Sequence, residues 1–277
     1  MSSTSSVDVN SAFPAMQDSA DAVQWTKLDG AQKLLANHSD AKRFFTKYTM
    51  LRTVVGEVKP VFYDSVRTRV KVLCEEKAFA AGEECDDLEA VSMHVVAYFH
   101  YRLFMEEMKE LMAQARLLKS IGMEGSGLRF QPREQNIDAS GDKPRARSSC
   151  RCGEPSVKVQ LHELSYCPAA FIPVGALRLR RVSKVSETGE FSEIVAKIDR
   201  VCVVKSVRCF DVGRVLMKAA EKIAREAFHV RWALVDAQLS SKGFYAKIGY
   251  APKAVQTCME LHLPYVVMAK CLAEASL

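Results

Sequence analysis

Two arginines and a glycine flank the start of a helical pattern in the stretch VRCFDVGRVLMKAAEK, residues 207–222. Arg208, Gly213 and Arg214 are residue types that can hold a phosphate. The first turn of a helix has free N–H groups and a partial positive charge, and glycine lets the backbone come close. Asp211 lies among them and opposes this chemistry with its negative charge. By itself, the same pattern also fits an ordinary strand–turn–helix junction.

The elements around this loop follow clear periodic patterns. Apolar residues recur at helical spacing over 212–228, which predicts an amphipathic helix. Upstream, IPVGALRLRRV and SEIVAKIDRVCVV predict two strands joined by a turn at 187–189, and RWALVDA (231–237) predicts another strand. The segment SSKGFYAKIG predicts a short helix that ends at Gly249. The chain then closes with strand patterns that break near Pro264.

The N-terminal half also alternates between helix and strand patterns. A helical pattern covers residues 28–47, YTMLRTVVGEV predicts a strand, and Pro60 opens a helix over 61–77. After a polar loop at 79–90, VSMHVVAYF predicts a strand, and 102–121 is an amphipathic helix pattern. Together these elements predict a mixed α/β fold with a mainly antiparallel sheet and flanking helices.

The composition of the chain suggests its division into domains. Residues 1–25, rich in Ser, Asp and Ala, are expected to form a disordered tail. Residues 122–156 are rich in Gly, Ser, Pro and Arg and read as a linker. We therefore expect residues 26–277 to form a single domain with a helical and linker insertion at about residues 100–170.

The bulk composition excludes several classes of protein. Of 277 residues, 48% are hydrophobic and 26% charged, as in folded soluble proteins. The net charge of +6 favours an anionic partner such as a phosphorylated cofactor, but is too small to indicate direct nucleic-acid binding. No apolar run approaches the roughly 20 residues that span a bilayer, and we expect no secretory signal at the N-terminus. The nine cysteines are then expected to be reduced thiols in an intracellular protein.

Several motifs resemble the GNAT superfamily of N-acetyltransferases. In IDRVCVVKSVRCFDVGRVLMKAAEKIAREA and VDAQLSSKGFYAKIGY, Arg208 takes the first position of the family's Arg/Gln-x-x-Gly-x-Gly/Ala loop, Gly213 the last, and Asp211 the middle glycine. The upstream half resembles the ElaA-like branch, with paired glutamates, an acidic cluster and a histidine on the next strand. The counterparts here are Glu75, Glu76, Glu84, Asp86, Glu89 and His94. The resemblance covers about 48–99 and 171–270 and implies a GNAT-like acyl-CoA acyltransferase fold.

This resemblance implies acetyl-CoA as co-substrate, bound where the family's fourth and fifth strands separate. The main chain of the fourth strand would pair with the pantetheine arm through Val201 and Val203. Amides of the loop and of the helix start would hold the pyrophosphate, with added charge from basic side chains. The residues concerned are Lys205, Arg208, Val212, Gly213 and Arg214.

The resemblance also implies catalytic residues. Tyr245 matches the family position whose phenol protonates the departing CoA thiolate. A phenol of pKa about 10 can protonate the thiolate of a thiol of pKa about 8.5 held against it. The alternative is that Tyr245 packs beside Phe244 in the core. Asp199 and His94 are the candidates for the base that takes a proton from the amine, and a structural role is open for both.

Asp211 is the main departure from the family pattern. At an effective dielectric constant of about 20, two like charges about 4 Å apart repel by about 4 kcal/mol, which is up to about a thousandfold in affinity. This cost falls if the side chain turns outward or pairs with Lys205 or Arg214. A weakened enzyme, a rearranged working loop and a non-catalytic module all remain open.

Three other patterns in the sequence are charged or of metal-binding type. Four residues of metal-ligand type lie in or near the linker: Cys150, Cys152, His162 and Cys167. Their spacing is unusual for zinc, and no metal site is predicted. The basic residues of RLRRVSK (178–184) indicate either an exposed strand face or a site for an acidic substrate or partner. The acidic loop 83–89 is either solvated or borders the acceptor site, where carboxylates would attract a cationic amine.

The sequence thus predicts an intracellular N-acetyltransferase that moves acetyl from acetyl-CoA to a primary amine in a ternary complex. The acceptor would be a small amine or a protein lysine, for example in a histone tail, and the N-terminal tail and insertion suggest membership of a protein complex. The alternative is a catalytically weakened GNAT-fold module in such a complex. A phosphate-ligand binder of another fold is a third hypothesis, which requires that the two strands do not separate. No membrane partner is expected.

Overall fold

The computed structural model describes residues 25, 27–33, 41–77, 85–120, 170–185, 192–253, 258–260 and 263–272. The chain forms two units, residues 1–102 with 163–277 and residues 103–162, and each is described by itself. Of the second unit the structure describes only the body of helix α5 (Tyr101–Ser120), which agrees with the helix predicted over 102–121. The single domain over residues 26–277 with an insertion at about residues 100–170 stays a prediction.

The first unit is built on an eight-stranded sheet in the order β1-β2-β3-β4-β5-β8-β6, with β7 also paired to β8. The strands are β1 (Thr49–Val55), β2 (Met93–His100), β3 (Phe171–Val185), β4 (Ser192–Val203), β5 (Trp232–Gln238), β6 (Ala251–Pro252), β7 (Cys258–Glu260) and β8 (Leu263–Cys271). All neighbours are antiparallel except β4 and β5, which are parallel. The predicted mixed, mainly antiparallel sheet is confirmed. Pro264, near which we expected a break, lies inside β8.

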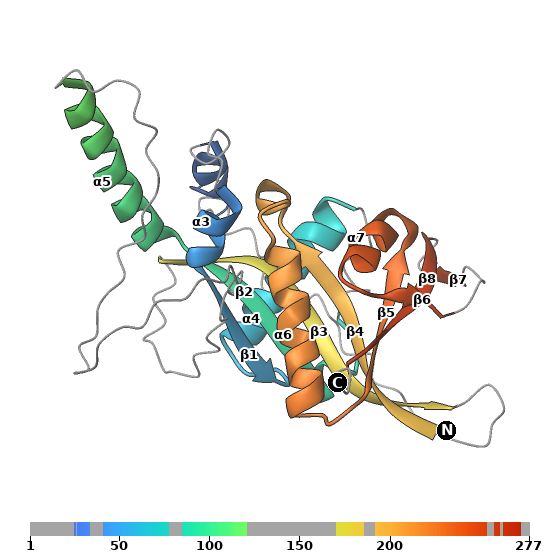
Figure 1. The fold of residues 1–277 in the computed structure, drawn as a ribbon. Coiled ribbons are helices and arrows are strands. Elements are labelled where there is room, and N and C mark those ends of the chain that lie inside the picture. The colour runs from blue at the N-terminus through green and yellow to red at the C-terminus, as the bar shows by residue number, and fades with distance from the viewer. Residues whose placement is uncertain are drawn as a thin grey trace, which may run out of the picture. The chain divides into compact units, whose positions relative to one another are not determined.

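Helices cover both faces of this sheet (Figure 1). They are α3 (Ala41–Lys47), α4 (Val61–Arg69), the π-helical turn η1 (Val70–Glu75), α6 (Val212–Glu226) and α7 (Lys242–Lys247), with 3₁₀ turns η3 (Glu89–Val91), η4 (Lys205–Val207) and η5 (Leu239–Ser241). On one face, the hydroxyl of Tyr98 in β2 donates to Asp64 of α4 at 2.8 Å. Ala97, the residue before Tyr98 in β2, pairs with Gly175 of β3. Successive residues of a strand face opposite sides, so Ala97 faces the side of the sheet that α6 covers.

Gly175 shows how closely α6 approaches the sheet. A Cβ at this position would lie 2.9 Å from the carbonyl oxygen of Cys202 and 3.0 Å from a methyl of Leu216. Any larger residue would therefore push α6 away from β3 and β4. This packing fixes the start of α6 beside the end of β4, where the sequence predicts the phosphate loop.

An N-terminal helical segment, residues 27–33, packs near the same loop. Leu28 and Ala31 are buried, and the hydroxyl of Ser206 in η4 bonds to the carboxylate of Asp29. Trp25 donates its indole N–H to the carbonyl oxygen of Pro173 at 3.3 Å. The connection from β4 to α6 is thus supported from outside the sheet.

Candidate active site

β4 and β5 pair at only three positions and then separate. The last pair is Ile198–Val235, whereas β4 continues to Val203 and β5 to Gln238. The structure describes every residue of both strands. The pairing therefore ends after Ile198 although both strands continue. Main-chain groups beyond Ile198 are left without sheet partners across the opening, and such groups need another partner. The separation implied by the resemblance is present.

A β-bulge in β4 accompanies this separation. On the β3 side, Asp199 pairs with Arg178 and Cys202 pairs with Ala176, so two residues of β4 lie opposite one residue of β3. One of the two, Arg200, has a left-handed backbone with φ of 53°. A bulge bends its strand and increases the local twist. The bend therefore turns β4 away from β5 where their pairing ends.

A pocket of about 280 Å³ occupies the opening between the two strands. Its lining includes residues 198–201 of β4, Asp236 and Gln238 of β5 and Tyr245 of α7, with Arg178 and Arg180 from β3. Side chains on several elements therefore converge where the strands diverge. We call this space the split pocket.

Tyr245, the predicted acid, lies in the split pocket and is buried. Burial raises the pKa of Tyr245, and the neighbouring Cys202 and Asp236 raise it further. The phenol therefore stays protonated at neutral pH and can donate a proton. Its ring also packs at 5.1 Å from Phe244 and 6.0 Å from Tyr250, so the contact expected for a core residue exists as well.

Asp199, one candidate base, also lines the split pocket. Its carboxylate accepts from Nε of Arg178 at 2.6 Å and from Nη2 of Arg180 at 2.8 Å. Both carboxylate oxygens are thus held by guanidinium groups. These contacts suit a structural role, in which Asp199 holds the side chains of Arg178 and Arg180 in place.

His94, the other candidate base, is buried and is not among the residues that line the split pocket. Its Nε2 lies 3.3 Å from the carbonyl oxygen of Glu89, and its ring packs edge-on at 5.0 Å from Phe62. Burial lowers the pKa of His94 below its usual value of about 6.5. The imidazole is therefore neutral at pH 7 and sits behind the pocket wall.

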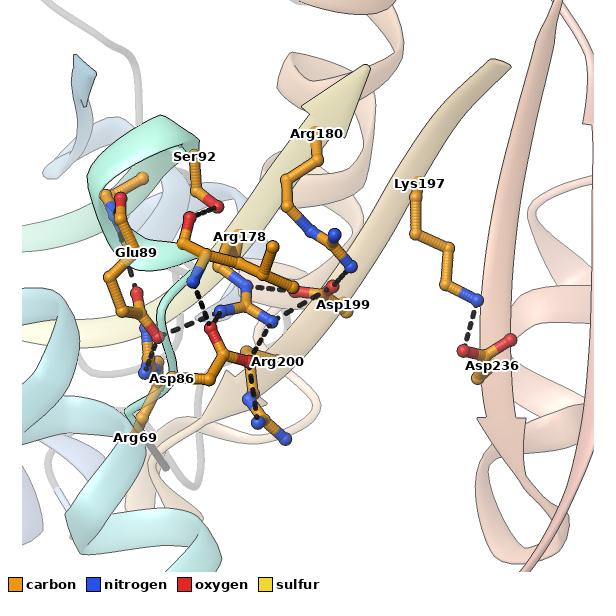
Figure 2. Close-up of polar contacts among 12 residues, drawn as sticks. Arg69, Asp86, Glu89, Ser92, Arg178, Arg180, Lys197, Asp199, Arg200 and Asp236 are labelled. Atoms are coloured by element: carbon orange, nitrogen blue, oxygen red, sulfur yellow. Dashed lines mark hydrogen bonds and ion pairs between the residues drawn. The ribbon is translucent and has the colours of Figure 1, made fainter. Parts of the chain in front are cut away.

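An ion-pair network supports this wall (Figure 2). The buried Arg178 contacts Asp86 at 2.5 Å, Glu89 at 2.9 Å and Asp199 at 2.6 Å, and the buried Arg69 binds both oxygens of Glu89 at 3.0 and 2.7 Å. Burial raises the pKa of Asp86, but bonds from Arg178 outweigh this and hold it below its usual range. The expectation that the acidic loop is solvated is wrong for Glu89, because its carboxylate neutralises buried arginines.

Asp211 turns outward at the start of α6. It adopts the left-handed conformation with φ of 62°, which glycine takes at no cost and aspartate tolerates better than most residues. Its side chain is 44% exposed, and its carboxylate lies 4.0 Å from Nε of Arg214. This is one of the arrangements in which the aspartate interferes least with a bound phosphate. Gly213 packs tightly, since a Cβ there would lie 3.2 Å from the Phe244 ring.

The predicted phosphate ligands in the loop have an unexpected partner in Glu76. Arg208 folds back so that its Nε donates to the carbonyl of Val203 at 3.0 Å, and its Nη2 forms an ion pair with Glu76. Glu76 also accepts from the amide of Lys205 at 3.3 Å. A carboxylate thus engages two groups that were expected to hold the pyrophosphate. The sequence marked Glu76 only as part of a motif.

Two other predicted cofactor residues lie at the split pocket and at the start of α6. Val201 lines the split pocket, and the buried Val212 begins α6. Two polar contacts that the sequence did not reveal join the sides of the opening: Lys197 pairs with Asp236 (Figure 2), and Lys77 with Gln238 at 2.9 Å. These contacts cross the opening between residues that are distant in sequence.

The described residues show neither a metal-ligand cluster nor a membrane-spanning helix. They contain no group of three or more potential ligands that could hold a metal ion. The four cysteine and histidine residues considered for zinc lie outside them. Among the helices described, none is long and apolar enough to cross a bilayer.

Comparison with known proteins identifies the segment that carries the split. The family model described as "Acetyltransferase (GNAT) domain" matches residues 166–272. This segment belongs to the GNAT acetyltransferase family. It contains β3 to β8 with α6 and α7, and hence both strands of the split and Tyr245. The resemblance proposed from the sequence is confirmed.

Known relatives of the GNAT segment cover part of the chain. A Bacillus subtilis (strain 168) protein whose name marks it as a candidate acetyltransferase is 33% identical over 99 residues, 36% of this chain and 59% of its own length. The chain spans 58–62% of the curated relatives it matches. A crystal structure described as an N-acetyltransferase from Lactobacillus plantarum has a TM-score of 0.46 at 17% identity, covering 81% of this chain and 99% of that one. Escherichia coli ElaA has a TM-score of 0.44 at 13% identity, covering 80% and 99%.

Proposed function

We propose that this protein transfers acetyl from acetyl-CoA to a primary amine, in a ternary complex and without a covalent acyl-enzyme. The observation that carries the proposal is the split pocket: a GNAT segment in which β4 and β5 separate beside the start of α6, with the buried phenol of Tyr245 in the opening. The third hypothesis, a phosphate binder of another fold, is wrong because the strands do separate and the family is GNAT.

The chain's own residues suggest how acetyl-CoA would be held. The main chain of β4 at Val201 and Val203 would pair with the amides of the pantetheine arm, once Arg208 releases the carbonyl of Val203. The N–H groups of Val212 and Gly213, with Arg214, would face the pyrophosphate at the start of the 15-residue helix α6. Arg208 and Lys205 would join them only after Glu76 withdraws. The outward Asp211 leaves this approach open.

The transfer forms a bond from the amine nitrogen to the acetyl carbon and breaks the carbon–sulfur bond. The departing thiolate needs one proton, which we assign to the phenol of Tyr245. The nitrogen loses one proton, which we assign to water, since guanidinium groups hold both oxygens of Asp199 and His94 does not line the pocket. We assign Asp199 and His94 to the support of the pocket wall.

The alternative, a weakened GNAT module that serves as a binding subunit, has one observation in its favour. Glu76 occupies Arg208 and the Lys205 amide, where a cofactor phosphate is expected. An intracellular location, a protein-lysine acceptor and assembly through the N-terminal tail and the insertion remain predictions. The tail and most of the insertion lie outside the described residues.

Acetyl-CoA binding and turnover test the proposal. Calorimetry of the full chain with acetyl-CoA should show binding, and release of free CoA thiol should depend on an added amine. Tyr245→Phe should keep the binding and lower kcat by about a hundredfold, because a general acid contributes about 10²–10⁴. Absence of acetyl-CoA binding, or full activity of the Tyr245→Phe variant, would contradict the assignment.

A further inference from the structure

Two cationic side chains lie at the inner end of the split pocket. Arg180 of β3 and Lys197 of β4 are register partners, and both line the pocket. Lys197 precedes Val203, the last residue of β4, by six residues, a distance along the strand of roughly 20 Å. These two residues, which we call the inner cations, are therefore remote from the predicted pyrophosphate loop. They are too distant to hold the cofactor's phosphates at that loop.

Within the described part of the chain, the network around the inner cations contains more cations than carboxylates. Four arginines share three carboxylates: Arg69, Arg178, Arg180 and Arg200 with Asp86, Glu89 and Asp199. Lys197 and Asp236 form a balanced pair beside them. The neighbouring His94 is neutral at pH 7, because burial lowers its pKa. Among the described residues this gives one more cation than carboxylates, and Lys77 adds another cation, whose side chain bonds to the neutral side chain of Gln238.

Arg180 is an arginine of this network that retains donor capacity. Arg178 uses Nε, Nη1 and Nη2 on carboxylates, whereas Arg180 has one contact, from Nη2 to Asp199, an oxygen of which also receives Arg178. The Nε of Arg180 is buried without a hydrogen-bond partner among the described residues. Buried donors are nearly always satisfied, so this one calls for an acceptor. A guanidinium fork matches a planar or tetrahedral oxyanion best.

A cationic pocket also affects the amine that reacts. Nearby positive charge disfavours the ammonium form and lowers the pKa of an amine bound there. More of the bound acceptor is then the free base that attacks the thioester, which reduces the need for a dedicated base. The same field repels an acceptor whose only charges are positive, such as a polyamine or a lysine-rich tail.

We propose that the acceptor is a small amine that also carries an oxyanion, a carboxylate or a phosphate, which Arg180 and Lys197 bind at the inner end of the split pocket. This inference rests on the transferase function proposed above and names its acceptor class. The oxyanion anchors the molecule against the inner cations, and the amine points back toward Tyr245. A histone-type tail is rich in lysine and would be repelled by the positive charge of the pocket.

Paired acceptors test the inference directly. The wild-type full chain is assayed with 4-aminobutyrate against butylamine and with phosphoethanolamine against ethanolamine, each pair compared at equal free-base concentration. In at least one pair, kcat/KM should be tenfold or more higher for the anionic member, and the pair that responds distinguishes carboxylate from phosphate. Equal rates within both pairs, or faster acetylation of a diamine or a lysine-rich peptide, would overturn the inference.

Arg180→Gln and Arg181→Gln form a matched pair of variants. Arg181 is the next residue on β3, is exposed and does not line the split pocket. Arg180→Gln should lower kcat/KM for the preferred anionic amine about tenfold or more, with little effect on its neutral partner or on the Kd of acetyl-CoA. Arg181→Gln should change none of these. An equal loss for both members of the pair in Arg180→Gln would overturn the anchoring role.

Direct binding separates a failure of this inference from a failure of the proposed function. Acetyl-CoA and 4-aminobutyrate are titrated separately into the wild type and both variants by calorimetry, with phosphoethanolamine as the phosphate probe. Binding of acetyl-CoA without amine selectivity refutes the acceptor class and leaves the transferase intact. Absence of acetyl-CoA binding refutes the proposed transferase function. The oxyanion-binding role of Arg180 and Lys197 is then tested by the binding of 4-aminobutyrate and phosphoethanolamine alone. Binding weakened by Arg180→Gln but not Arg181→Gln supports this role, and any other result refutes it.

Discussion

Replacement of Glu76 by glutamine should strengthen the binding of acetyl-CoA. In the structure this carboxylate neutralises Arg208 and accepts from the Lys205 amide at 3.3 Å, in the loop proposed for the pyrophosphate. A bound pyrophosphate therefore has to displace Glu76 or be repelled by it. Glutamine keeps a carbonyl oxygen for the Lys205 amide and removes the negative charge.

The size of the effect follows from exposure and distance. The side chain of Arg208 is 42% exposed and that of Glu76 is 18% exposed, and a partly exposed pair contributes only about 0.2–1 kcal/mol. The repulsion between the carboxylate and a phosphate about 4 Å away ranges from about 1 kcal/mol in water to about 4 kcal/mol near a protein surface. A carboxylate that swings into solvent keeps the smaller value. The ion pair that must be broken and the remaining repulsion together oppose the binding of acetyl-CoA by about 1.4 kcal/mol. Their removal should lower the Kd of acetyl-CoA about tenfold.

Calorimetry with acetyl-CoA at about 0.15 M salt measures this change under physiological screening. Glu75→Gln is the matched control, because it removes the same charge from the neighbouring residue, whose carboxylate pairs with Lys71 at 2.5 Å. We expect a tighter Kd for Glu76→Gln and little change for Glu75→Gln. Weaker binding by Glu76→Gln would show that Glu76 positions Arg208 for the cofactor, and an equal gain in both variants would reduce the effect to net charge. Either result refutes the reasoning.

Three further substitutions probe the loop, the buried histidine and the network. Asp211→Gly should change the acetyl-CoA Kd by less than about threefold, because the exposed carboxylate pairs only at 4.0 Å with Arg214; a hundredfold gain by calorimetry would contradict the outward geometry. The folded pKa of His94 is depressed, so its contribution to stability is present above pH about 6.5 and is lost as the pH falls through the folded value, at up to about 1.4 kcal/mol per pH unit. His94→Gln should flatten this part of the denaturant-derived unfolding free energy between pH 7 and 5, and an unchanged slope would count against it. Glu89→Gln leaves Arg69 and Arg178 short of a buried carboxylate, which costs about 3–5 kcal/mol and should lower Tm by about 10 °C; a shift below 2 °C would show that the network is not stabilising.

Local patterns predicted the elements and the order in which they occur. Helix α6 was visible because its apolar residues keep helical spacing over four turns, and its observed bounds, 212–226, end two residues before the predicted ones. The separation of β4 from β5 was not visible in the residues of either strand. It was inferred from a family resemblance, since the bulge that opens the strands depends on pairing with β3.

Contacts between distant residues were the part that the sequence could not supply. The basic segment 178–184 allowed two interpretations, and the alternation of strand faces places Arg178 and Arg180 in the pocket wall and leaves Arg181 exposed. Glu89, 89 residues before Arg178 in sequence, was expected to be solvated or to attract an amine. Its burial is a consequence of the fold, because the pairing of β2 with β3 brings the acidic loop to β3. No local spacing of residues indicates that Glu89 and Arg178 are in contact.

The ion-pair network and the split depend on one another. β4 leaves β5 after Ile198, and the next residue, Asp199, is the one that Arg178 and Arg180 hold. Buried ion pairs add little net stability compared with apolar packing, so the advantage of this network is geometric: it ties the bulged part of β4 to β3 where the β5 ladder has ended. Arg178 is committed to that task with all three of its nitrogens. Arg180 stands at the edge of the network with a single carboxylate contact. It is therefore a position at which the charge of the pocket can change while the strands keep their separation.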